Sequence, residues 1–236
     1  GIKISMDKTL HILGDSFCCD FDWWDENIEY NHFKSSEEYN SSHQWIDIVK
    51  NNLKFDEVKN HSQAGCSMYY LSAKLNQLIQ NKEIKKDDKV IIGLTSISRI
   101  QHPYKTKTAG KVYYLESDEW NDINNRMKTH KDINFLESLT HWGIEMNAWF
   151  PIVLYHFLTH YKIDFCFASF IYHNYLGTHF DKSLKNHPIQ KLMFGREPKT
   201  RISNYYGEDK DMPTHLDKKG NKKLANDLTK FLEEIW

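Results

Sequence analysis

Residues 9–16 of the chain read TLHILGDS, a short apolar run that ends in Gly14, Asp15 and Ser16. Five largely aliphatic residues followed at once by glycine predict a buried strand that enters a tight turn. A serine directly after such a turn presents its hydroxyl near the amino end of the next helix, where backbone N–H groups favour negative charge. Because Gly-Asp-Ser is also an ordinary turn sequence, the tripeptide alone does not establish a catalytic serine.

The rest of the chain alternates between helix and strand patterns. Apolar residues at helical spacing predict four helices, over residues 45–53, 68–79, 133–161 and 218–235. The third of these is expected to kink or break at Pro151. Three short apolar runs predict further strands, at residues 55–58, 89–94 and 163–170. Strands separated by helices indicate an α/β protein with a mainly parallel sheet covered on both faces, and functional loops at the carboxyl ends of its strands.

The length and composition fit one globular domain over residues 1–236. A chain of 236 residues that is 40% hydrophobic and 14% aromatic can bury a full core without disulfides. Residues 101–131 are polar and rich in Lys, Asn and Asp. We therefore expect an insertion or a long loop there, and not a second domain.

The charge and cysteine patterns argue against several classes of partner. Lys and Arg total 31 against 32 Asp and Glu, so no charge excess favours nucleic acid or an acidic membrane surface. The longest apolar stretch, around residues 149–158, is too short to cross a bilayer. Four cysteines, without CxxC spacing, are expected to be buried free thiols: Cys18, Cys19, Cys66 and Cys166. Free thiols, and a start without a signal-peptide pattern, favour the cytoplasm.

One histidine pair has a spacing that metal sites use. His156 and His160 are four residues apart in a predicted helix, as in a zinc-binding pair. No Glu follows His156 and no third ligand is evident, so we predict no metal site.

Three further segments place polar groups next to predicted strand ends. Residues 60–65 read NHSQAG. Gly65 either offers its N–H to a developing oxyanion or is needed only because the loop requires a positive φ there. Residues 93–96 read GLTS, whose hydroxyl groups either donate into a site or cap a following helix. His215 lies just before the last helix with acidic residues nearby, which suits an oriented general base or a plain surface histidine.

In order and placement, the four segments resemble the SGNH hydrolases, also called the GDSL esterase/lipase family, over nearly the whole chain. The resemblance implies a three-layer α/β/α sandwich with a mainly parallel, flavodoxin-like sheet, and no metal or organic cofactor. It also implies that Ser16 is the nucleophile and His215 its general base. The oxyanion hole would be formed by the N–H groups of Ser16 and Gly65, with help from Thr95.

Two positions depart from the family pattern. Thr95 stands where the family has an asparagine in the oxyanion hole, and its hydroxyl is a single donor of shorter reach. The family's acid lies three residues before the histidine, where this chain has Met212. Asp211, four residues before, is the acid we expect, with a Ser–His dyad, Asp209 or Asp217 as alternatives.

These roles imply a serine ester hydrolase that works through an acyl-enzyme on Ser16. Mixed aromatic and polar residues around the expected site suit a short acyl group, such as acetyl, on a carbohydrate or another small molecule. Trp23 and Trp24 would contact the substrate, and Arg99 would bind an anionic group on it. The alternatives are a binding or structural module of the same fold with little or no turnover, and an acyltransferase that uses the same serine.

Overall fold

The computed structural model of the chain describes residues 8–15, 17–18, 45–63, 65–97, 99–101, 112–114, 133–169, 182–205, 216 and 218–236. At its centre is a five-stranded sheet in which every pair of neighbouring strands is parallel, in the order β2-β1-β3-β6-β7. The strands are β1 (Thr9–Leu13), β2 (Glu57–Asn60), β3 (Lys89–Gly93), β6 (Asp164–Ala168) and β7 (Met193–Phe194).

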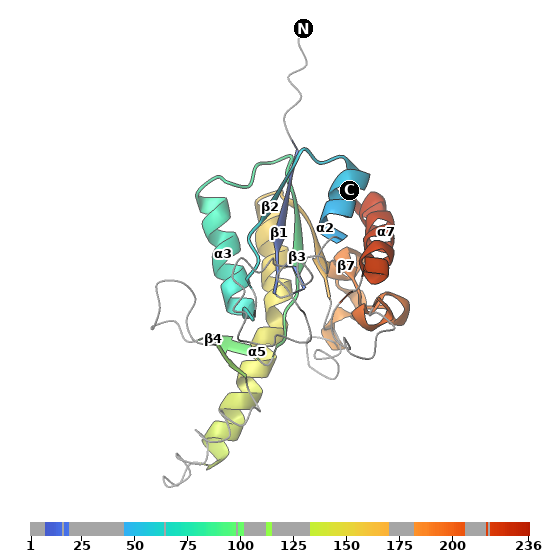
Figure 1. Ribbon diagram of the computed structural model, residues 1–236. Helices are drawn as coiled ribbons and strands as arrows, with labels where there is room; N and C mark the ends of the chain where they lie inside the picture. Colours follow the sequence, from blue (N-terminus) through green and yellow to red (C-terminus); the bar gives the residue numbers. More distant parts are fainter. Residues whose placement is uncertain are drawn as a thin grey trace, which may run out of the picture.

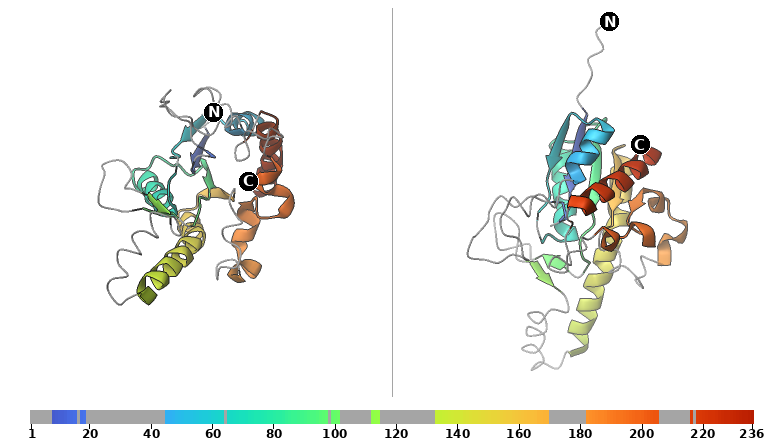
Figure 2. Two further views of the ribbon diagram at one scale, coloured as in Figure 1. Left: turned by 60° about the horizontal axis from the view of Figure 1, so that its bottom comes forward. Right: turned by 45° about the vertical axis from the view of Figure 1, so that its right-hand side comes forward.

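Helices cover both faces of this sheet, as Figures 1 and 2 show. One face packs against α3 (Met68–Gln80) and α5 (Ile133–His160), and the other against α2 (Trp45–Leu53) and α7 (Lys218–Ile235). A separate antiparallel ribbon joins β4 (Arg99–Gln101) to β5 (Val112–Tyr114). Four short 3-10 helices lie on either side of β7: η3 (Leu184–Asn186), η4 (Pro188–Leu192), η5 (Pro198–Thr200) and η6 (Ile202–Asn204).

The order in which strands are added to the sheet reverses next to β1. From β1 the chain moves to the edge strand β2 and then returns to the opposite side of β1 to form β3. Counted within the sheet, the order is 2-1-3-4-5, one of the common doubly wound arrangements. In such sheets a crevice for ligands opens outside the carboxyl ends of the two strands at the switch. That crevice would lie between the ends of β1 and β3.

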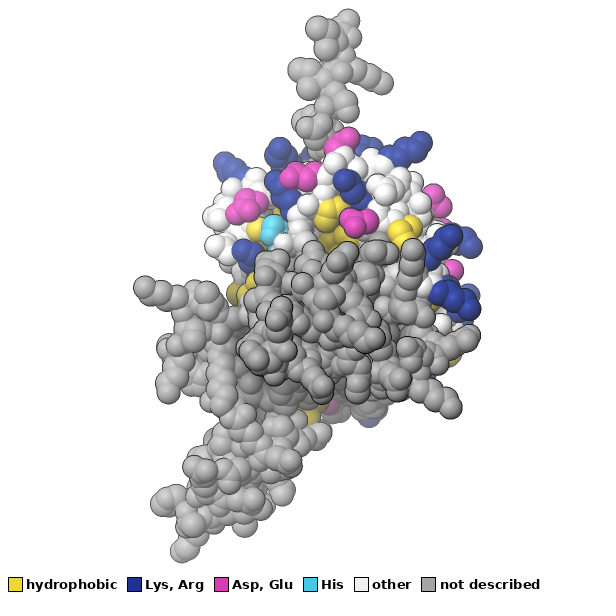
Figure 3. All heavy atoms as spheres, viewed as in Figure 1, with side chains coloured by type: hydrophobic (Ala, Val, Ile, Leu, Met, Phe, Trp, Pro, Cys, Tyr) yellow, Lys and Arg dark blue, Asp and Glu magenta, His cyan; other side chains and the backbone are white. Residues whose placement is uncertain are grey.

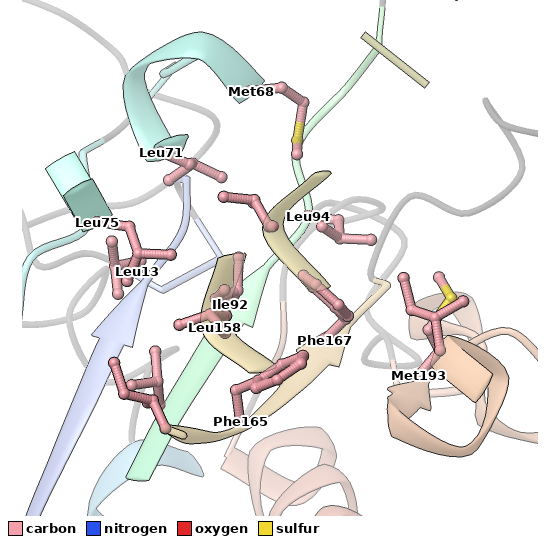
Figure 4. Close-up of a cluster of buried hydrophobic side chains, with 14 of the residues drawn as sticks. Leu13, Met68, Leu71, Leu75, Ile92, Leu94, Leu158, Phe165, Phe167 and Met193 are labelled. Atoms are coloured by element: carbon pink, nitrogen blue, oxygen red, sulfur yellow. The ribbon is translucent and has the colours of Figure 1, made fainter. Parts of the chain in front are cut away.

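The core consists of two clusters, one on each side of the sheet. Neighbouring strands are in register, so successive rows of side chains point to opposite faces. On the face toward α3 and α5 such a row is Leu13, Ile92 and Phe167, with Leu71, Leu75 and Leu158 from the helices, as Figure 4 shows. On the other face the row is Ile12, Ile91 and Cys166, with Trp45, Val49 and Leu228 from the helices. Each buried side chain of this size stabilises the fold by about 1.5–3 kcal/mol.

Most of the predicted elements are confirmed, and the differences have local causes. The strand at residues 9–13 and the helices at 45–53 and 218–235 have the predicted bounds. The strand predicted at 55–58 lies at Glu57–Asn60 instead. Lys54 has a φ of +56° and the Phe55 N–H bonds to Lys50 O at 3.0 Å, so the chain is still closing α2 where the strand was expected.

The long helix α5 continues through Pro151 without the predicted break. Ala148 precedes the proline and Leu154 and Leu158 follow it, and all three are buried, so the helix is packed on both sides of Pro151. Of the predicted insertion at 101–131, residues 112–114 form β5; the other residues from 102 to 132 lie outside the described ranges. The β4–β5 ribbon was not predicted.

Candidate active site

Gly14 and Asp15 directly follow β1, at the carboxyl edge of the sheet and at the switch point. A Cβ on Gly14 would lie 2.5 Å from Cys18 Sγ, so a glycine is required there by close packing. Asp15 is 1% exposed. Its Oδ1 accepts the Phe17 N–H at 3.1 Å, and its backbone oxygen accepts the Cys18 N–H at 2.9 Å. Two hydrogen bonds thus fix the chain on both sides of position 16.

Asp15 is paired with residues that follow β3. Its Oδ2 lies 3.0 Å from Arg99 Nη1 and 3.0 Å from Thr95 Oγ1. The Arg99 side chain is 14% exposed and Thr95 is completely buried, so water screens this ion pair little. Arg99 Nη1 also donates to Thr95 Oγ1. We call Asp15, Thr95 and Arg99 the Asp15 cluster.

The segment around Gly65 joins the same cluster. The Gln63 N–H and the Cys66 Sγ both donate to Gly14 O, at 3.0 and 3.3 Å. Cys66 O lies 3.0 Å from Thr95 Oγ1 and 3.3 Å from Arg99 Nη1. Three of the four segments singled out in the sequence therefore meet in one hydrogen-bonded network.

Gly65 itself has a φ of +69°, and a Cβ there would meet no atom of the described residues within 4 Å. The glycine at this position is therefore explained by backbone conformation and not by close packing. The oxyanion role of its N–H stays a prediction.

Asn147 holds the chain that carries Arg99. It is 8% exposed on α5, and its Nδ2 donates to Ile97 O at 2.7 Å and to Arg99 O at 2.9 Å. The two amide hydrogens can thus satisfy two carbonyl groups next to the cluster. Sequence reasoning missed Asn147, because one polar residue in a long helix gives no signal of what it contacts.

The fourth segment, around His215, is connected to the turn after β1 through Leu216. Trp45 Nε1 donates to Phe17 O at 3.1 Å, and the Trp45 backbone N–H donates to Asn221 Oδ1 at 3.2 Å. Asn221 Nδ2 in turn donates to Leu216 O at 3.3 Å. We call Trp45 and Asn221 the buried bridge. It joins the residue after Ser16 to the residue after His215.

The structure places some of the predicted site residues and not others. Gly65, Thr95 and Arg99 are described and lie around Asp15, whereas five predicted site residues lie outside the described ranges: Ser16, Trp23, Trp24, Asp211 and His215. The alternative acids Asp209 and Asp217 also lie outside them.

The contacts of Thr95 and Arg99 differ in kind from the predicted roles. The single hydroxyl proton of Thr95 points at Asp15 or Cys66 O, so donation to an oxyanion would require it to turn away from both. Arg99 Nη1 is engaged with Asp15 within the chain. Both predicted roles stay predictions, while the observed contacts support the turn that follows β1.

A second buried carboxylate, unused by this site, lies at the opposite edge of the sheet. Asp88 accepts the Thr9 N–H at 3.2 Å, the Lys85 N–H at 2.8 Å and His11 Nε2 at 3.1 Å. His11 Nδ1 is 3.0 Å from His61 Nε2, and the two rings are stacked. We call Asp88, His11 and His61 the Asp88 chain.

Burial keeps both rings of this chain neutral. It lowers the pKa of His11, against the opposing effect of Asp88. It lowers the pKa of His61 to about 4, with the neighbouring His11 as the next cause. With Asp88 accepting from His11 Nε2–H, His11 Nδ1 is left to accept from His61.

Other features of the described residues bear on cofactors and partners. Cys18, Cys66 and Cys166 are buried and form no disulfide among the described residues, and Cys19 lies outside the described ranges. No three metal-ligating side chains in the described ranges are grouped to hold an ion, and no described helix is long and apolar enough to cross a membrane. On the described part of the face in Figure 3, basic and acidic side chains are interspersed.

The Asp15 cluster can hold the turn after β1 in one conformation at the carboxyl ends of the strands. A guanidinium, a hydroxyl and one backbone N–H all converge on one carboxylate at the place where doubly wound sheets bind ligands. Compared with known proteins, the sequence matches no protein-family model and no curated protein.

Proposed function

We propose that this chain is a serine ester hydrolase of the SGNH type, in which Ser16 is the nucleophile and His215 its general base. The observation that carries the proposal is the meeting of three distant segments at Gly14 and Asp15. These are the segments that resemble the first three blocks of that family. They meet at the switch point of the sheet, where the fold favours a site.

The Asp15 cluster supplies what a nucleophilic turn needs. A serine attacks efficiently only when its hydroxyl is held close to the productive geometry, and a misplacement of about 1 Å can cost 10²-fold in rate. Asp15 bonds the backbone beyond position 16 and is itself held by Arg99 and Thr95. In the proposal, Arg99 and Thr95 therefore fix the nucleophilic turn.

The proposed reaction has two steps. His215 removes the proton of the Ser16 hydroxyl as the oxygen attacks the ester carbonyl, and the tetrahedral oxyanion accepts hydrogen bonds from the N–H groups of Ser16 and Gly65. The intermediate collapses, His215 returns the proton to the leaving alcohol, and an acyl-enzyme remains. Water then attacks the acyl group with His215 again as base, which releases the acid and restores Ser16. Asp211 orients His215 in this scheme.

The substrate class in the proposal is a short acyl ester, such as an acetyl group on a carbohydrate. It rests on the sequence around Trp23 and Trp24, whose rings suit the apolar face of a sugar. A p-nitrophenyl ester series tests it, because each additional buried CH₂ would favour a lipase by up to ~0.8 kcal/mol. We expect kcat/KM to fall after acetate or butyrate, and a steady rise to octanoate would contradict this substrate class.

The nucleophile is tested by labelling with a fluorophosphonate and by hydrolysis of p-nitrophenyl acetate. Ser16→Ala should abolish labelling and lower kcat/KM by about 10³-fold or more, because nucleophile and base act as a unit. Ser72→Ala is the matched control, since this hydroxyl only donates to Met68 O within α3. If Ser16→Ala keeps labelling, or keeps more than about a tenth of kcat/KM, Ser16 is not the nucleophile.

One observation favours a second candidate, a binding module of the same fold without turnover. Thr95 replaces the asparagine of the related family, and its hydroxyl is bonded inside the Asp15 cluster. A module of this kind would neither react with the fluorophosphonate nor hydrolyse the esters. The same two measurements on the unmodified chain therefore distinguish the candidates.

A further inference from the structure

The buried bridge links two loops that are far apart in the sequence. Phe17 O accepts from Trp45 Nε1 on α2, and Leu216 O accepts from Asn221 Nδ2 on α7. The bond from the Trp45 backbone N–H to Asn221 Oδ1 closes the chain. Three hydrogen bonds thus run from the turn after β1 to Leu216, two residues before α7.

The bridge lies entirely in the core. Trp45 and Asn221 are both 0% exposed, and Cys18 and Leu216 belong to the same buried cluster as Trp45. The two bonds of Asn221 are buried and the bond to Phe17 O is part-buried, so competing water weakens them little, and leaving one partner unpaired is costly. Breaking a bond of the bridge should therefore be costly.

The position of Asn221 has a simpler partial explanation. Trp45 is the first residue of α2, so its N–H has no partner within the helix, and Asn221 Oδ1 satisfies it. That contact alone would explain a buried oxygen acceptor on α7. It does not explain why the amide nitrogen of Asn221 and the indole N–H of Trp45 each reach a carbonyl of a different loop.

The geometry points to Trp45 and Asn221 as positioning residues that fix the Ser16 turn relative to the His215 loop. This inference rests on the proposed function for its catalytic meaning, because Phe17 and Leu216 are the chain neighbours of the proposed nucleophile and base. General-base catalysis needs the two side chains within hydrogen-bond reach. Since they are separated by about 200 residues of sequence, tertiary contacts have to set that distance, and the bridge is one that joins their chain neighbours.

The test uses two variants that break the bridge and two that spare it. Trp45→Phe keeps an aromatic ring but removes the indole donor to Phe17 O, and Asn221→Ala removes the amide bonds to Trp45 N and Leu216 O. Val49→Ala opens a cavity in α2 and removes no hydrogen bond of the bridge. Tyr205→Phe removes one part-buried hydrogen bond, to Asp227, from a residue of the same cluster.

The bridge variants should lower kcat for p-nitrophenyl acetate by about tenfold or more with KM within about twofold, because misplacement acts on the chemical step. The two control variants should change neither constant beyond about twofold at temperatures well below every Tm. If Trp45→Phe lowers kcat no more than Val49→Ala does, the bridge is only a packing feature and the inference is wrong.

Nuclear magnetic resonance gives a readout that does not depend on activity. In Trp45→Phe, the amide of Leu216 and the imidazole of His215 should shift, and in Asn221→Ala the amides of Ser16 and Phe17 should shift. Tyr205→Phe should move none of these signals. Shifts confined to the mutated end would overturn the coupling, whether or not the chain is an esterase. Absent labelling of Ser16 in the unmodified chain would instead overturn the proposed function.

Discussion

Asp15 and Asp88 are two almost completely buried carboxylates at opposite edges of the same sheet, with 1% and 2% exposure. Asp15 follows β1 at the carboxyl edge and is neutralised by Arg99. Asp88 precedes β3 at the amino edge and is stabilised by two backbone N–H groups and His11. One charge is balanced by an opposite charge, and the other by neutral donors.

The difference indicates what each carboxylate is for. Replacing a buried ion pair by apolar residues of similar size is often neutral or stabilising, so such a pair is weak evidence for stability and suits a site that fixes a turn. Asp88 instead joins the start of β1, the loop before β3 and the His11–His61 pair. Its partners are parts of the fold, and two of the groups in this chain, His11 and His61, change protonation with pH.

The largest effect should follow from breaking the ion pair of the Asp15 cluster. Arg99→Leu leaves the Asp15 carboxylate buried without a counter-charge, and we expect the free energy of unfolding to fall by about 3–5 kcal/mol. Urea denaturation at pH 7 measures it. Asp15→Asn added to Arg99→Leu should recover part of the loss, because the uncompensated charge is then removed.

Asp164→Asn is the control for this prediction. It breaks the ion pair of Lys89 with Asp164, which is 57% exposed, so the loss should be under about 1 kcal/mol. A loss from Arg99→Leu as small as that of the control would mean that Asp15 does not need its counter-charge. The contrast between the two carboxylates would then disappear.

A smaller loss is expected at the other carboxylate. Asp88→Asn removes one acceptor oxygen from a group that accepts from Thr9, Lys85 and His11, so at least one buried donor loses its partner. Leaving one such donor unpaired costs about 1–3 kcal/mol. The measurement is the same denaturation series, and a loss exceeding that of Arg99→Leu would reverse the proposed ranking of the two sites.

The two carboxylates were not equally visible in the sequence. The alternation of short apolar runs with helical patterns predicted the parallel sheet, and Gly14-Asp15-Ser16 marked the carboxyl edge of β1. His11, however, sits in the run TLHIL and reads there as one more strand residue. Its partners Asp88 and His61 are 77 and 50 residues away, and no local pattern records such pairs.

The buried bridge was hidden for a similar reason. Asn221 lies in a run of Lys and Asn residues, GNKK, that is typical of a solvated helix start. Its complete burial results from the packing of α7 against α2. Arg99 was noticed as a charged residue after β3, but only the tertiary structure pairs it with Asp15.

The Asp88 chain should make stability depend on pH in a defined direction. His11 and His61 have a pKa below the ordinary 6.5 in the folded protein, so the unfolded chain binds protons first as the pH falls. The contribution of His61 is therefore full above about pH 7 and is lost as the pH falls from about 6.5 to 4, and the contribution of His11 is lost in the same direction.

The remaining charges near the pair set the details of this titration. Lys59 and Lys74 oppose protonation, whereas Glu57 and Glu83 favour it, and Asp88 favours it at His11. Two protonated rings would bring two N–H groups together at 3.0 Å, so the pair cannot take up two protons and keep its hydrogen bond.

His61→Gln removes one of the two titrating groups of the pair. In denaturation experiments between pH 7 and 5, the variant should lose about 1 kcal/mol less stability than the unmodified chain does. The exposed His160 supplies the control, and His160→Gln should leave the pH dependence unchanged. Equal slopes in all three proteins would show that the stacked pair does not couple to folding.

The smallest effects are expected at Gly65, where substitutions distinguish a requirement for the backbone conformation from a role in the proposed reaction. With a φ of +69° and no atom of the described part of the chain within 4 Å of a Cβ, Gly65→Ala should cost only the left-handed strain of about 1 kcal/mol. Gly65→Asn should cost less, since asparagine tolerates that region. Gly195→Ala is the contrast: its Cβ would lie 2.7 Å from Ser169 O, so it should cost more than either.

Both Gly65 variants keep the backbone N–H, so fluorophosphonate labelling of Ser16 should persist in each. If stability falls as expected but labelling is lost in both, the open space beside Gly65 is occupied by the reacting group, and the side chain excludes it.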